Sequence, residues 1–79
     1  MQLHVEATKY ADMSEIMQAL KSLPGVSNVR EENYNKGKSV ITLETTIKPQ
    51  TVFRLLKEKV SFNLFMKNVN ANDMTITTK

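Results

Sequence analysis

The chain has 79 residues, of which 41% are apolar and 24% charged, an ordinary balance for one small folded domain over residues 1–79. It contains no cysteine, no tryptophan and a single histidine, His4. This composition excludes a disulfide framework, a cysteine-ligated zinc site, an iron–sulfur cluster, a thiol nucleophile and a two-histidine metal site within one chain. The net charge of +3 permits contact with nucleic acid but does not predict it.

The sequence predicts no membrane span. No apolar run approaches the roughly 18 residues that a bilayer crossing requires. The N-terminal MQLHVEATK lacks the apolar core of a signal peptide. We therefore expect a cytoplasmic protein, with a soluble domain excised from a larger envelope protein as the alternative, because the absence of cysteine fits either redox compartment.

The first third of the chain predicts a strand and a helix. Residues Leu3 to Ala7 alternate apolar and polar side chains, as a half-buried strand does. Asp12 stands three residues before Glu15, a capping-box-like spacing, and Pro24-Gly25 is typical of a helix end. Between them lies an apolar stripe at spacings of three and four, formed by Met13, Ile16, Met17, Leu20 and Leu23. These signals predict a helix from Asp12 to Leu23.

The middle of the chain predicts an antiparallel hairpin. Its strands are expected at Val29 to Tyr34 and Ser39 to Thr46, joined by a turn that contains Gly37. In the second strand, Ile41 and Leu43 point one way. Val40, Thr42 and Glu44 point the other way.

The last third predicts a helix and two strands. Pro49 suits the first turn of a helix, and the expected buried stripe is Val52, Phe53, Leu56 and Val60. Residues Phe62 to Lys67 alternate as a strand. After a turn-rich stretch, Met74 to Thr77 forms a short final strand, expected to pair back on the one before it.

This order predicts an α+β protein, a ferredoxin-like β-α-β-β-α-β sandwich with an antiparallel sheet, two helices on one face and a short extra C-terminal strand. The helices should cover one set of side chains: Leu3, Val5, Ile41, Leu43, Leu64 and Met66. The opposite face should be uncovered and should carry His4, Glu6, Thr42, Glu44, Asn63, Phe65 and Thr75. Because antiparallel sheets often face water on one side, this face is predicted either as an interaction surface or as a plain solvated one.

Several residues resemble heavy-metal-associated domains of the copper chaperone and metal-ATPase type. The resemblance covers about residues 3 to 60 and rests on Ile16, Leu20, Leu23-Pro24-Gly25-Val26, Val29 and the Val-Ile-Thr-Leu strand. It implies a ferredoxin-like fold. That family binds soft metal through two cysteines of a C-x-x-C loop before the first helix, and those positions fall on Lys9 and Asp12 here.

These two replacements remove the family's metal chemistry. A lysine ammonium has no lone pair at neutral pH, and Asp12 offers a hard oxygen, so neither replaces a thiolate toward Cu(I) or Zn(II). We expect no metal and no cofactor. Asp12 is expected to cap the helix while Lys9 is solvated, or the two form a surface ion pair worth about 0 to 1 kcal/mol.

A looser resemblance covers most of the chain. The Leu-Pro-Gly-Val helix end, the hairpin, Leu55-Leu56, the alternating strand and Met74-Thr75-Ile76 are similar to small modules of bacterial envelope, secretion and flagellar assembly proteins. This resemblance implies packing against neighbouring copies or subunits, without chemistry.

The other candidate residues point to structural roles. His4 is conceivable as a general base or a single metal ligand, yet no nucleophile or orienting partner accompanies it. Met13 and Met17 are expected to fill the core rather than to bind Cu(I). Nucleic-acid binding is not expected, because Phe65 alone is placed as a sheet-face aromatic on which a base could stack.

The sequence thus favours a non-enzymatic protein-interaction or structural module. Its contact would be with a protein partner or a second copy, through the sheet face or an edge strand. The alternative is a regulatory domain that binds a small ligand or metal ion through the loop Thr8 to Asp12. An enzyme would need a cleft contributed by another chain.

Overall fold

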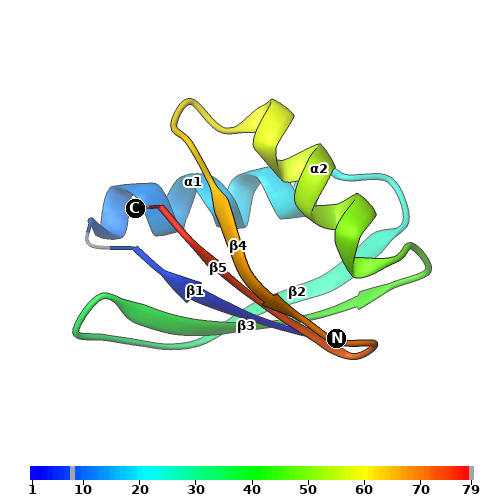
Figure 1. Ribbon diagram of the computed structural model, residues 1–79, viewed down its shortest axis with the longest axis horizontal. Helices are drawn as coiled ribbons and strands as arrows, with labels where there is room; N and C mark the ends of the chain where they lie inside the picture. Colours follow the sequence, from blue (N-terminus) through cyan, green and yellow to red (C-terminus); the bar gives the residue numbers. More distant parts are fainter. Residues whose placement is uncertain (8, 79) are drawn as a thin grey trace.

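The computed structural model describes residues 1–7 and 9–78 and has an α+β fold (Figure 1). In chain order its elements are β1 (Gln2–Glu6), α1 (Tyr10–Ser22), β2 (Val26–Asn35), β3 (Lys38–Thr45), α2 (Pro49–Lys59), β4 (Phe65–Val69) and β5 (Asp73–Thr77). The five strands form one sheet, and both helices lie on the same side of it (Figure 1).

The sheet is mixed, with the strand order β2-β3-β1-β5-β4. The pairs β2–β3, β3–β1 and β5–β4 are antiparallel, whereas β1 and β5 run parallel. The expectation of an all-antiparallel sheet is therefore corrected at one pair. The arrangement of two helices on one face of the sheet is compatible with a ferredoxin-like sandwich.

The parallel pair arises because the C-terminal strand enters the sheet between β1 and β4. As expected, β5 pairs back on β4, but it also pairs with β1, which brings Met74 beside Leu3 and Ile76 beside Val5. Both β5 side chains are fully buried. Burial of these two large apolar residues favours the inner position, and it leaves β4 at the edge.

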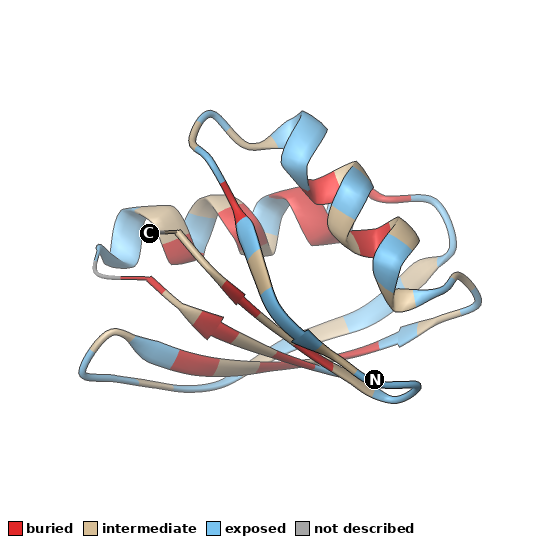
Figure 2. Ribbon diagram, in the orientation of Figure 1, coloured by how far each residue is buried: buried red, intermediate tan, exposed pale blue. Residues whose placement is uncertain are grey.

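The core lies between the helices and the sheet, where the buried segments of both layers face each other (Figure 2). The largest fully buried side chains are Leu3, Val5, Met13, Ile16, Leu20, Ile41, Leu43, Val52, Leu56, Leu64, Met74 and Ile76. Met66, Phe53 and Val60, which were expected in the core, are only partly buried at its margin. The predicted core role is confirmed for Met13, while Met17 is partly buried against the same cluster.

Helix α1 begins two residues earlier than predicted. Its N-cap is Lys9, whose carbonyl accepts from the amides of Asp12 and Met13, and no side chain caps the helix. The predicted cap at Asp12 is therefore wrong. Asp12 lies inside the first turn, where a carboxylate is still favoured by the positive end of the helix dipole.

Gly25 and Gly37 lie in the two turns that the sequence indicates, the first between α1 and β2 and the second between β2 and β3. Gly25 has a φ of +81°, and a Cβ at this position would lie 3.3 Å from Thr46 Oγ1. In the hairpin turn both Lys36 and Gly37 have positive φ, as a tight two-residue connection between antiparallel strands requires.

Two strands differ from their predicted bounds. β2 is longer than predicted and begins at Val26, whereas β4 begins later than predicted, at Phe65.

Within residues 1–7 and 9–78, no helix has the length and hydrophobicity that a membrane crossing needs.

Candidate functional site

The face of the sheet turned away from the helices is called the open face here. Paired residues on neighbouring strands share a face, so the register defines its members. The three inner strands β1, β3 and β5 contribute Gln2, His4, Glu6, Lys38, Val40, Thr42, Glu44, Asp73, Thr75 and Thr77. The two outer strands β2 and β4 add Arg30, Asn33, Asn35, Phe65 and Asn68.

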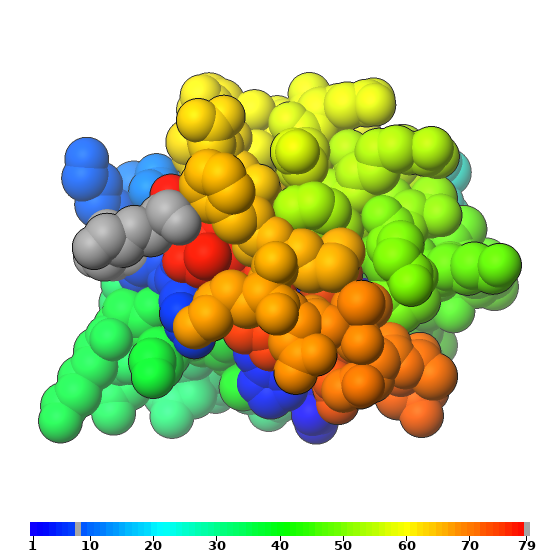
Figure 3. All heavy atoms as spheres, in the orientation of Figure 1, coloured from blue at the N-terminus to red at the C-terminus, as the bar shows by residue number. Residues whose placement is uncertain are grey.

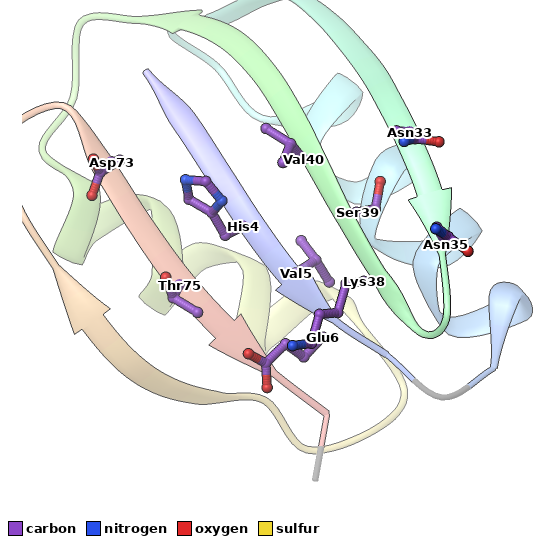
Figure 4. A pocket seen from close by; sticks show the side chains of 10 residues that line it. All are labelled: His4, Val5, Glu6, Asn33, Asn35, Lys38, Ser39, Val40, Asp73 and Thr75. Carbon is purple, nitrogen blue, oxygen red and sulfur yellow. The ribbon is translucent and has the colours of Figure 1, made fainter.

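A hollow of about 500 Å³ lies over the middle of the open face. Figure 4 shows His4 projecting from β1 into it, with Asp73 and Thr75 of β5 on one side and Val40 of β3 on the other. Glu6, Lys38, Asn33 and Asn35 complete its charged and polar lining. His4 thus lies on the side of the sheet that the alternation of β1 predicts, and the strand order places it at the centre of that face.

One end of the open face is basic. Lys67 of β4 reaches across β5, and its Nζ lies 3.1 and 3.2 Å from the two carboxylate oxygens of Glu6. Lys38 of β3 lies opposite Glu6 in the strand register, on the other side of β1. Two lysines therefore flank one carboxylate at this end, in a surface contact that is still partly exposed to water.

The other end of the open face is acidic. Asp73 is paired with Gln2 on this side, and its Oδ1 accepts a hydrogen bond of 3.0 Å from Asn70. Glu32 lies on the same face because its Oε2 accepts a 2.9 Å hydrogen bond from Thr42. Glu44 adds a third carboxylate, and the cations at this end are Arg30 of β2 and the Met1 ammonium, which donates to the carbonyl of Leu43. Charge therefore changes sign along the strands of a single face.

Six of the seven residues that the sequence places on the uncovered face, Thr75 among them, lie on this face. His4, Glu6 and Thr42 are half-buried, and Glu44 is exposed. Phe65 is 48% exposed, a large value for a phenylalanine. The exception is Asn63, which precedes β4 in the connection from α2, because the strand begins at Phe65, three residues later than the alternation predicts.

Both edge strands are irregular. β2 has register shifts between Ser27 and Arg30 and between Glu31 and Asn33, and β4 has one between Met66 and Asn68. Bulges and charged side chains on an edge discourage the addition of a further strand. The sheet face is therefore a better candidate contact surface than either edge.

The predicted loop site, Thr8 to Asp12, lies on the other side of the sheet, and its last three residues form the first turn of α1 rather than a loop. Thr8 falls outside the described residues. Lys9 is exposed and Asp12 half-buried, and neither makes an ion pair within the described chain. No group of three or more potential metal ligands occurs among residues 1–7 and 9–78. A ligand site in this loop stays a prediction.

Next to that loop, a cluster of hydroxyl groups surrounds Glu31. Tyr10 and Ser39 donate to its two carboxylate oxygens at 3.0 and 3.3 Å. Tyr34 donates to the carbonyl of Ala7, and its ring meets that of Tyr10 edge to face at 5.0 Å. The cluster joins the first turn of α1 to β2 and β3. The hydrogen bond to Glu31, with the added repulsion between two negative groups, raises the pKa of Tyr10 above its ordinary value.

Sequence reasoning missed another polar link, between α1 and the connection that follows α2. Glu15 accepts from the amide and the hydroxyl of Ser61, at 2.6 and 3.1 Å. The capping-box-like spacing in the sequence relates Glu15 to Asp12 instead. The residue that Glu15 contacts is 46 positions away, so no local spacing could have indicated it.

Comparison with protein-family models, curated proteins and solved structures found no significant match for this chain.

Proposed function

We propose that this chain is a non-enzymatic, ferredoxin-like interaction module, resembling a heavy-metal-associated domain without its ligands, whose open face binds a second copy of the chain. The observation that carries the proposal is the reversal of charge along the open face. Lys38 and Lys67 outnumber Glu6 at one end. At the other end the three carboxylates of Asp73, Glu32 and Glu44 outnumber two cations, Arg30 and the Met1 ammonium.

A two-fold axis makes this face complementary to itself. If the axis lies in the interface, crosses the strands at right angles and passes over His4, it brings the basic end of one copy onto the acidic end of the other. A two-fold interface uses the same patch on both copies, which is the usual arrangement of soluble dimers. Val40, next to His4 in the middle of the face, then meets its counterpart near the axis.

The edge strands are the weaker alternative, since bulges in β2 and β4 interrupt the regular row of amides and carbonyls that strand addition uses.

The proposal that the module is not an enzyme rests on the available side chains. The chain has no cysteine and only one histidine. His4 has Val40 and Thr75 as its cross-strand neighbours, rather than a nucleophile held by an orienting group.

Sedimentation equilibrium over a wide range of protein concentration tests the proposal. We expect a monomer–dimer equilibrium that weakens as salt is added, because the complementary ends are exposed to screening. Val40→Glu should abolish the dimer by placing two carboxylates near the axis. Gln18→Glu adds the same charge to the exposed helix layer and should leave the dimer intact.

A protein that stays monomeric at every concentration would refute the proposal. So would a dimer that survives Val40→Glu, or one whose formation protects the backbone amides of β2 or β4 from hydrogen exchange while the open face stays accessible.

A further inference from the structure

The excess positive charge of the chain is concentrated in one segment. Of eleven lysines and arginines and eight acids, the segment formed by α2 and its N-cap, residues 48–59, contains four cations and one acid. The rest of the chain holds seven of each. The net charge of +3 is therefore the charge of this segment. Its charged members are Lys48, Arg54, Lys57, Glu58 and Lys59, which we call the α2 patch.

All five residues of the α2 patch are exposed. Within residues 1–7 and 9–78 none of its cations forms an ion pair. The Nζ atom of Lys57 lies 5.5 Å from the centre of the Phe53 ring, within the same helix. Figure 3 shows side chains of this segment, in green and yellow, projecting along the upper right of the molecule. The cations are thus free to meet an external partner.

Helix stability explains only part of this pattern. Lys57 and Lys59 lie in the last turn, where the helix dipole favours cations. Lys48 is at the N-cap, where the dipole disfavours a cation, and the first turn contains no acid. Arg54 lies between the two ends. Helix stability therefore does not account for Lys48 and Arg54.

From these observations we propose that the α2 patch docks an acidic segment of a partner protein. Opposite charge on the partner would steer the encounter and set its orientation. A membrane surface fits less well, because the apolar side of α2 is committed to the core through Val52 and Leu56 and has nothing to insert. Nucleic acid fits less well because Phe53, the aromatic residue of α2, is half-buried and offers no exposed ring on which a base could stack.

The test is a titration of the whole ¹⁵N-labelled protein at low salt, followed by amide shifts. The probes are a synthetic peptide of ten glutamates, a short DNA duplex and vesicles containing phosphatidylserine. The peptide should shift the amides of α2 and of Lys48. Arg54→Gln with Lys57→Gln should weaken this binding roughly tenfold, since two exposed charge pairs are lost.

Lys9→Gln with Lys36→Gln is the matched control, because it removes the same charge from exposed positions outside α2. It should change the affinity for the peptide less than twofold. The proposal is overturned if the peptide binds elsewhere, if both double variants weaken binding equally, if the DNA or the vesicles shift α2 as strongly as the peptide does, or if no probe binds. This result is independent of dimer formation through the open face, which is measured without any probe.

Discussion

The two faces of the sheet use the same strands in different ways. On β1, Leu3 and Val5 are 0 and 1% exposed beneath the helices, whereas His4 and Glu6 on the open face remain half-buried. The covered face is apolar and is held by close packing. The open face is polar, carries charge of both signs and has the hollow around His4. Stability therefore depends mainly on the covered face, while the proposed contact with a second copy uses the open face.

Neighbouring residues on β5 provide the sharpest test of this difference. Ile76 is fully buried and Thr75 faces the hollow. Ile76→Ala should lower the free energy of unfolding by about 2–5 kcal/mol, because it removes packed side-chain volume from a small core. Thr75→Ala should change it by less than about 0.5 kcal/mol. Urea denaturation measures both, and comparable losses would contradict the division between the faces.

A smaller effect is expected from the ion pair on the open face. A double-mutant cycle with Lys67→Met and Glu6→Gln should give a coupling of about 0 to 1 kcal/mol that declines as salt is added. The cycle with Lys38→Met is the control. Lys38 lies opposite Glu6 on the neighbouring strand, whereas the hydrogen bonds of the Glu6 carboxylate come from Lys67, so the coupling between Lys38 and Glu6 should be weaker. A stronger coupling with Lys38 than with Lys67 would contradict the assignment of the ion pair to Lys67.

The smallest expected effect concerns Tyr10, at the exposed rim of the covered face. Because its pKa is raised in the folded protein, its hydrogen bond to Glu31 contributes stability below the ordinary tyrosine pKa of about 10. That contribution is lost as pH rises through the raised pKa. Tyrosine ring NMR signals followed with pH should show Tyr10 titrating above the ordinary value. Glu31→Gln should lower the pKa of Tyr10.

Glu32→Gln is the control for that titration. Glu32 is adjacent in sequence to Glu31 but bonds to Thr42 on the open face. Glu32→Gln should leave the titration of Tyr10 nearly unchanged. An equal pKa shift of Tyr10 in both variants would mean that the net charge nearby, rather than the hydrogen bond to Glu31, raises its pKa.

The open face illustrates how far local pattern carries a prediction. Alternation along β1 and β3 assigned His4, Glu6, Thr42 and Glu44 to the side away from the helices, because successive side chains of a strand point to opposite faces. The same pattern failed for Asn63, since the strand after α2 begins at Phe65. The pair between Lys67 and Glu6 was also out of reach. It crosses β5, and nothing local predicts that three strands from distant parts of the chain lie side by side.

The sequence by itself determined the order of helices and strands, the apolar stripes, the helix end at Pro24-Gly25 and the excess of cations in α2, since each depends on spacing or composition within one segment. Tertiary structure alone decided that β5 lies between β1 and β4, that Glu15 meets Ser61, and that acids and lysines gather at opposite ends of one face. Periodicity specifies which side of a strand is buried. Which strand becomes its neighbour depends on how all the apolar faces can be buried together in one core.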